Sequence, residues 1–157
     1  MAKVYLSLGS NVGDRLANLR TALERLGAAR VSPVYETEPV DYTEQGWFLN
    51  MAAELQTELP PLALLARAQQ IESALGRVRT VAKGPRTIDI DILLYGDAVV
   101  RSAELEIPHP RMAERRFVLA PLADLVPELP HPVTHRTVRE MLETAPAAVV
   151  RRLTELG

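Results

Sequence analysis

Two aspartates on one expected strand are the residues whose spacing points most directly to chemistry. Asp89 and Asp91 alternate with Ile88, Ile90 and Ile92. Alternation along a strand places both carboxylates on one face and the isoleucines on the other, which we expect to be the core side. Residues two apart on a strand start about 6.5–7 Å from each other, and such carboxylates can converge on shared divalent cations. The pair is therefore a candidate metal site, although the same alternation is typical of a solvated edge strand.

Arginines lie on both sides of this pair in the sequence. Arg77, Arg79 and Arg86 precede it, and Arg115 follows a turn that contains His109. Oxygen ligands favour magnesium or manganese over zinc, and magnesium commonly bridges carboxylates and substrate phosphates. Guanidinium groups would hold the remaining phosphate charge. The cluster thus predicts a site for a metal-bound polyphosphate. Each arginine alone is more typical of an exposed surface charge. His109 could equally be a loop histidine that has no functional role.

A turn with two glycines, from 9 to 14, lies between an expected strand and an expected helix. Phosphate loops occupy such places, but this turn lacks the Gly-Lys-Ser/Thr ending, which excludes a P-loop NTPase. We expect Gly9 and Gly13 to permit unusual backbone angles and Asn11 or Asp14 to cap the helix.

The two phenylalanines each lie beside a candidate functional residue. Phe48 is near Asn50, and Phe117 is near Arg115. Taken singly, each ring is more typical of core packing than of ligand binding.

Apolar periodicity predicts the elements that position these residues. The order is β-α-β-β-α-β, followed by a hairpin and two helices. This order is typical of a ferredoxin-like α+β sandwich, a mostly antiparallel sheet with helices packed on one face, to which C-terminal helices are added. The expected strands span 4–8, 31–37, 48–55 and 87–95, the first two helices 14–26 and 60–75, the hairpin 99–107, and the last two helices 112–125 and 134–143.

Composition narrows the class of protein. The chain of 157 residues is 47% apolar, which suits one domain over 1–157. It has no cysteine, which excludes disulfides and thiolate metal sites and suits a cytoplasmic location. A net charge of −2 argues against a nucleic-acid partner, and the lack of a long apolar run argues against a membrane. We expect a monomer.

Short motifs also occur in order along most of the chain. They are Leu8-Gly9-Ser10-Asn11 with Gly13-Asp14-Arg15, Tyr35-Glu36-Thr37-Glu38-Pro39, Phe48-Leu49-Asn50, the run from Gly84 to Leu93, and Ile107-Pro108-His109-Pro110 leading to Arg115 and Phe117. Together they resemble the 6-hydroxymethyl-7,8-dihydropterin pyrophosphokinase family. The resemblance implies that ATP gives its pyrophosphoryl group to the pterin hydroxymethyl oxygen and releases AMP, a step of folate synthesis.

The resemblance also implies roles for single residues and small-molecule partners, ATP and the pterin. Two Mg²⁺ ions would be held by Asp89 and Asp91, which with Arg77 and Arg86 form the implied catalytic set. The implied ATP site consists of Gln69, Glu72, Arg77, Arg79, Arg86, Ile92, His109 and Arg115. The pterin would stack between Phe48 and Phe117, and the rest of its site would be Thr37, Val40, Asn50 and Asp89.

Two other classes of function stay open at this point. A ferredoxin-like module that binds RNA or a regulatory small molecule is one, because this fold serves many functions; such a module should carry aromatic residues across its sheet. A metal-dependent phosphohydrolase that uses the same aspartates is the other. Products distinguish them, since AMP with pyrophosphorylated pterin indicates transfer, and phosphate or ADP indicates hydrolysis or simple kinase chemistry.

Overall fold

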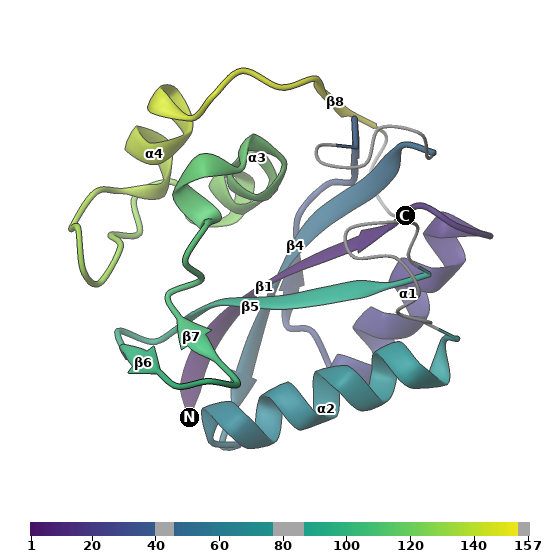
Figure 1. The fold of residues 1–157 in the computed structure, drawn as a ribbon, viewed down its shortest axis with the longest axis horizontal. Helices are drawn as coiled ribbons and strands as arrows, with labels where there is room; N and C mark the ends of the chain where they lie inside the picture. Colours follow the sequence, from purple (N-terminus) through teal and green to yellow (C-terminus); the bar gives the residue numbers. More distant parts are fainter. Residues whose placement is uncertain (40–45, 77–86, 154–157) are drawn as a thin grey trace.

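The computed structural model describes residues 1–39, 46–76 and 87–153 (Figure 1). Eight strands, four α-helices and one 3₁₀ helix lie within these ranges. Their bounds are β1 Ala2–Ser10, α1 Arg15–Leu26, β2 Arg30–Val31, β3 Tyr35–Thr37, β4 Phe48–Thr57, α2 Pro61–Ala74, β5 Asp89–Tyr95, β6 Val100–Arg101, β7 Glu106–Ile107, η1 Met112–Glu114, α3 Arg116–Leu125, α4 Val138–Thr144 and β8 Val150–Arg152.

One six-stranded sheet organises the molecule. Its strand order is β5-β1-β4-β3-β8, with β2 also paired to β4, and these pairings are antiparallel. The short β6–β7 hairpin forms a separate two-stranded sheet. The predicted α+β class and the order β-α-β-β-α-β are confirmed.

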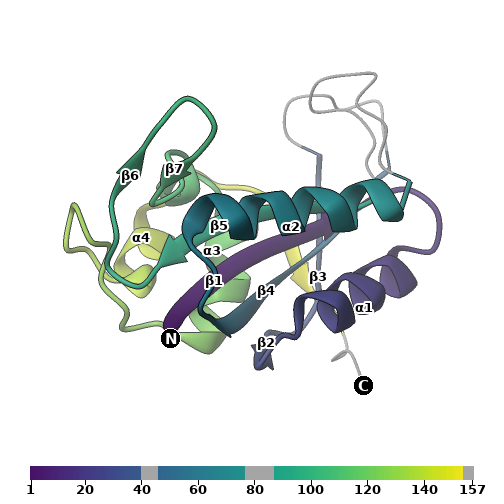
Figure 2. The same ribbon diagram turned by 90° about the horizontal axis from the view of Figure 1, so that it is seen from below.

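Helices cover both faces of the sheet. In Figure 1, α3 and α4 lie on one side of β1 and β5, with α1 and α2 on the other, and in Figure 2 α2 lies in front of β5 and β1. On one face α1 and α2 pack on a core that includes Leu6, Met51 and Ile90. On the other face α3 and α4 pack on a second core that includes Tyr5, Ala52 and Leu93. The two helices of the βαββαβ unit therefore share one face, as expected, and the added C-terminal helices cover the other. These helices find a second apolar surface there, made by Tyr5 of β1, Ala52 of β4 and the two leucines Leu93 and Leu94 of β5.

The first helix begins and ends as its sequence predicts. Asp14 is the N-cap, and its carboxylate accepts a hydrogen bond of 3.1 Å from the Ala17 amide. Gly27 ends the helix in the left-handed region at φ 71°, which glycine adopts at little cost. The second helix follows Pro60 and starts at Pro61, where a missing N–H costs nothing.

An irregularity in β5 changes which side its residues face. The pairing with β1 shifts between Tyr5 and Leu6, which lie opposite Leu94 and Ile92. Leu93 is thus an extra residue, a β-bulge, and both Leu93 and Leu94 join the core beneath α3. Strict alternation holds before the bulge, which is where the two aspartates lie.

Other predicted elements also differ from the structure. The helix expected over 134–143 begins only at Val138 and ends at Thr144. The strand expected over 31–37 is two short strands, because Pro33 has no amide for a ladder bond and the Ser32 hydroxyl accepts the Ala52 amide at 2.8 Å. The helix expected over 112–125 is interrupted at Arg115, which has extended backbone angles. The strand β8 was not predicted. Within the described ranges, no helix is long and apolar enough to cross a bilayer.

Candidate functional site

The candidate site is built on one row of residues that crosses four neighbouring strands. The sheet register places Asp89 of β5 opposite Gly9 of β1, Gly9 opposite Asn50 of β4, and Asn50 opposite Tyr35 of β3. Ala52, two residues along β4 from Asn50, belongs to the core beneath α3. Because alternate residues share a face, the row lies on the α3 side of the sheet.

Gly9 leaves room in the middle of this row. A Cβ atom at this position would lie 2.6 Å from Asn50 Oδ1 and 3.5 Å from Phe48 Cδ2. Glycine is therefore required here by the close approach of the Asn50 amide. The Asn50 amide oxygen takes the place above β1 that a side chain at this position would need.

The Asn50 side chain is held in one orientation. It is buried, and its Nδ2 donates to the Thr37 hydroxyl, which is also buried. Thr37 in turn lies opposite the half-buried Phe48 in the pairing of β3 with β4. Since Nδ2 is engaged by Thr37, the Asn50 carbonyl oxygen is the end of the amide that faces Gly9.

The two aspartates project from β5 on the same side as Asn50. Both are partly exposed, whereas Ile88, Ile90 and Ile92 are buried on the opposite side, so the predicted alternation is confirmed. Asp91 lies opposite Ser7 of β1. Within the part of the chain that the structure describes, no group of three or more metal-binding side chains gathers. Any metal held here would depend on two carboxylates with other ligands from substrate or water.

The backbone between the aspartates is anchored from α2. Glu72 is 5% exposed, and its Oε2 accepts the Ile90 amide at 2.9 Å. β5 is the first strand in the sheet order. The Glu72 carboxylate therefore pairs an edge amide that lies between Asp89 and Asp91.

His109 and Arg115 lie at the α3 side of β5. The His109 amide donates to the Leu93 carbonyl at 3.0 Å, and its Nδ1 accepts the Arg111 amide at 3.2 Å. Burial, followed by the positive charge of Arg115, lowers the pKa of His109 to about 4, although Asp89 opposes this change. The imidazole is therefore neutral near pH 7 with Nε2 protonated, a donor suited to an anionic ligand.

Phe117 lies in the first turn of α3 and packs partly against the second core. The guanidinium of Arg115 lies 5.6 Å from the centre of its ring, within cation–π range. At the far end of α3, the Tyr35 hydroxyl donates to Asp124 Oδ2 at 2.5 Å. This bond fixes the helix that carries Phe117 to the strand that carries Thr37.

The remaining candidate residues are placed less centrally. Gln69 is exposed on α2. The Ile92 side chain is buried in the core beneath α1 and α2, so a ligand could meet only its backbone. Four candidates lie outside the described residues, namely Val40, Arg77, Arg79 and Arg86.

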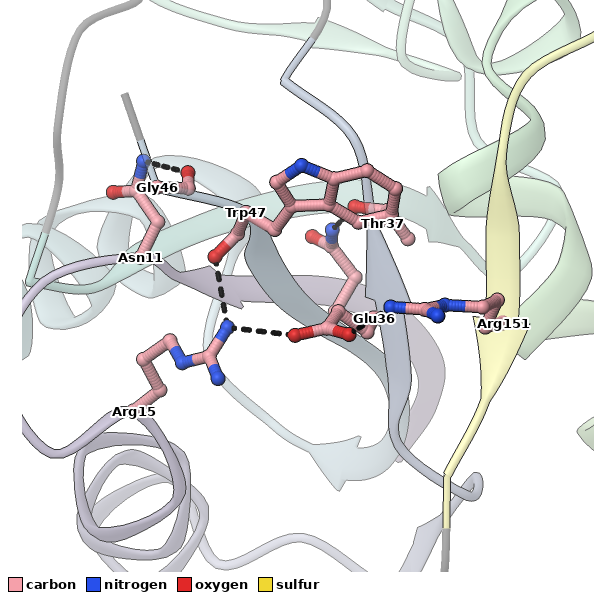
Figure 3. A network of polar contacts seen from close by, with 8 residues as sticks. Asn11, Arg15, Glu36, Thr37, Gly46, Trp47 and Arg151 are labelled. Carbon is pink, nitrogen blue, oxygen red and sulfur yellow. Dashed lines mark hydrogen bonds and ion pairs between the residues drawn. The ribbon is translucent and has the colours of Figure 1, made fainter. Parts of the chain in front are cut away.

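One cluster beside the row carries no role in the sequence prediction. Arg15 donates to Glu36 Oε2 at 3.3 Å and to the Trp47 carbonyl at 2.9 Å, while Arg151 donates to Glu36 Oε1 at 2.6 Å (Figure 3). The Arg151 guanidinium also lies 5.2 Å from the centre of the Trp47 ring. We call these four residues the Glu36 cluster. Arg15 and Glu36 occur in the quoted motifs, which was the available signal, but Arg151 lies on the unpredicted β8.

The site therefore combines paired carboxylates, a held amide and partly exposed aromatic rings on one sheet face of an α+β sandwich. A sequence profile for 7,8-dihydro-6-hydroxymethylpterin-pyrophosphokinase (HPPK) matches residues 5–127. The chain belongs to this family, as the resemblance of its motifs implied.

Three curated relatives match this chain over different shares of their own length. The 2-amino-4-hydroxy-6-hydroxymethyldihydropteridine pyrophosphokinase of Bacillus subtilis is 51% identical over 127 residues, which cover 77% of this chain and 76% of the relative. The protein of the same name from Methylorubrum extorquens is 45% identical over 159 residues, covering 98% and 99%. The folic acid synthesis protein fol1 of Schizosaccharomyces pombe is 46% identical over 153 residues, but the chain spans only 21% of its length.

Solved structures support the fold. An HPPK-DHPS protein in complex with substrates superposes with a TM-score of 0.72 at 17% identity, covering 91% of this chain and 43% of that one. Wild-type HPPK-DHPS of Plasmodium falciparum gives a TM-score of 0.69 at 19% identity, covering 91% and 43%. At such identities the likeness concerns the fold alone.

Proposed function

We propose that this chain transfers the pyrophosphoryl group of ATP to 6-hydroxymethyl-7,8-dihydropterin, a step of folate synthesis. The pterin hydroxymethyl oxygen attacks the β-phosphorus, and the bond from that phosphorus to the oxygen shared with the α-phosphate breaks. AMP leaves, and the hydroxyl proton is released. The observation that carries the proposal is the row Asp89–Gly9–Asn50, in which a carboxylate and a fixed amide lie on either side of Gly9 on one sheet face, in a chain of this family.

The pterin would lie over this row. The Asn50 amide, oriented by Thr37, offers a carbonyl acceptor to the N–H groups on the polar edge of the ring. Phe48 and Phe117 offer faces for stacking, and Val40 would contribute backbone contacts. Holding a flat ring in one pose brings its hydroxymethyl group to a fixed place, and such positioning accounts for much of phosphoryl-transfer catalysis.

The triphosphate would lie beside the aspartates. Asp89 and Asp91 suit two magnesium ions, because Mg²⁺ prefers oxygen ligands and is usually bound by one or two carboxylates together with phosphates and water. Bound magnesium would neutralise phosphate charge that the two carboxylates alone would repel. His109 would donate Nε2–H to a phosphate oxygen, and Arg115 would add a guanidinium.

Arg77, Arg79 and Arg86 would complete the phosphate contacts, with Arg77 and Arg86 at the reacting phosphates. Gln69, Glu72 and the Ile92 backbone would border the nucleotide. Glu72 also has a structural task, since it accepts the Ile90 amide between the aspartates.

We further propose that residues 1–157 form one domain that acts as a cytoplasmic monomer. One continuous sheet shared by both cores supports a single domain. The absence of cysteine from the sequence suits a reducing compartment.

The test is AMP formation from ATP, magnesium and 6-hydroxymethyl-7,8-dihydropterin. We expect AMP and pyrophosphorylated pterin from the wild type, a loss of at least about 100-fold in Asp89→Ala and Asp91→Ala, and no loss in Asp97→Ala, a control in the exposed turn after β5. Removing magnesium with a chelator should abolish AMP formation. Phosphate or ADP as product would indicate a hydrolase or a simple kinase, and no product from folded wild type would favour a binding module.

A further inference from the structure

The Glu36 cluster joins four parts of the chain that are distant in sequence. Glu36 lies in β3, Arg15 opens α1, Arg151 lies in β8, and Trp47 precedes β4. The contacts form a closed ring, since Arg15 and Arg151 each contact both Glu36 and Trp47. Figure 3 shows the two guanidinium groups approaching the Glu36 carboxylate from opposite sides.

Two members of the cluster, Glu36 and Trp47, are each one residue away from a member of the proposed pterin site. Glu36 precedes Thr37, and Trp47 precedes Phe48. Glu36 points away from the face that carries Thr37, because neighbours on a strand project to opposite sides. The cluster therefore lies behind the site, where it can hold the strands without touching a ligand.

The cluster also determines how β3 lies against β4. β3 has only three residues, and its register with β4 pairs Thr37 with Phe48 and Tyr35 with Asn50. The bond from Asn50 to Thr37 requires this register. A second hydrogen bond supports the entry to β4, since Asn11 Nδ2 donates to the Gly46 carbonyl at 3.0 Å.

We propose that Glu36 is a positioning residue for the pterin site. Its two ion pairs fix β3 and the start of β4 against α1 and β8, and thereby hold Thr37, Asn50 and Phe48 in the arrangement that binds the ring. The inference rests on the proposed function, because it concerns the affinity of the same site for its pterin. It assigns no contact with ATP to the cluster.

The test compares Glu36→Gln with a matched control, Glu128→Gln. Glu128 forms an ion pair of the same length, 2.6 Å, with Arg139 on the exposed side of α4. For each variant the dissociation constant of 6-hydroxymethylpterin is measured by fluorescence titration, the KM of ATP by AMP formation, and the melting temperature by calorimetry. We expect Glu36→Gln to weaken pterin binding about fivefold and to leave the KM of ATP within twofold, while Glu128→Gln changes neither.

A second variant keeps the proposal testable if Glu36→Gln folds poorly. The Arg151 side chain is 64% exposed, so Arg151→Gln should fold, and it should weaken pterin binding in the same direction. The double variant should bind pterin little more weakly than Glu36→Gln, because the ion pair between Glu36 and Arg151 is already lost in Glu36→Gln. Unchanged pterin affinity in the folded variants would overturn the proposal. An equal rise in the dissociation constant of the pterin and in the KM of ATP would overturn it as well. A wild type that forms no AMP would instead overturn the proposed function.

Discussion

Replacing Gly9 by alanine tests whether the Asn50 amide, which lies above β1, binds the pterin. The new Cβ would lie 2.6 Å from Asn50 Oδ1, whereas an ordinary contact begins near 3.4 Å. The amide must therefore move by roughly 0.8 Å, the difference between these distances. It cannot move freely, because Nδ2 is bonded to the buried Thr37 hydroxyl.

The size of the effect follows from this displacement. A misplacement of about 1 Å in a positioned group can cost about 100-fold in rate, and loss of one neutral hydrogen bond costs about 1 kcal/mol. We therefore expect kcat/KM for the pterin to fall 10- to 100-fold, which is about 1.4–2.8 kcal/mol of transition-state stabilisation. The KM of ATP should change little, since Gly9 lies on the pterin side of Asp89.

The assay measures AMP formation over a range of pterin concentrations at saturating ATP. Gly46→Ala is the matched control, because a Cβ there would meet its nearest atom, the Asn11 carbonyl oxygen, at 3.4 Å and the residue has no positive φ. We expect this control to behave as the wild type. A Gly9→Ala protein that is folded and has unchanged kcat/KM for the pterin would refute the location of the ring above β1.

Three further predictions concern titratable groups. The hydrogen bond from Arg30 is the largest of the effects that hold the pKa of the buried Glu54 carboxyl below 4.5. The stability that this shift gives the folded protein is fully present above pH 4.5 and is lost as the pH falls through the lowered pKa. Glu54→Gln should cost about 1 kcal/mol at pH 7 and flatten the acid dependence of urea unfolding, and an unchanged slope would contradict this. Burial, followed by the bond to Glu54, raises the pKa of Tyr5 from 10.0 to about 12, so stability should be lost as the pH rises through this range. In urea unfolding, the Tyr5→Phe variant should not show this loss of stability at alkaline pH. Parallel plots of stability against alkaline pH for the wild type and Tyr5→Phe would disprove the link to Tyr5. By NMR in the absence of nucleotide and magnesium, His109 should titrate near pH 4, and a midpoint above 6 would show that burial and Arg115 do not control it.

Much of the sheet could be predicted because its pattern is local. Asp89 and Asp91 alternate with buried isoleucines, and this alternation alone placed the carboxylates on one face. The bulge at Leu93 could not be predicted, because two adjacent leucines fit a core on either side until the partner strand is known. β8 was missed for a similar reason, since Val150–Arg152 has only three residues and becomes a strand by pairing with β3.

The site was predictable as a set of residue types and less so as an arrangement. The Asn50–Thr37 hydrogen bond and the close approach of Asn50 to Gly9 depend on the register of three strands, which no single segment encodes. The carboxylate of Glu72 was assigned to the nucleotide, and the structure adds its bond to the Ile90 amide. That contact joins a helix to a strand edge, and helical periodicity in α2 does not reveal it.

The strand order has a consequence for how the chain folds. β1 precedes both of its partners in the chain, since β4 and β5 come later. The contact of Tyr5 with Glu54 closes a loop of 49 residues, and that of Glu36 with Arg151 spans 115. Distant pairings of this kind slow folding compared with helical bundles, because chain entropy is lost before the contacts form. During synthesis, the apolar segment Ala2–Ser10 must therefore wait unpaired until β4 has been made, and the Glu36 cluster can close only after Arg151 has been made.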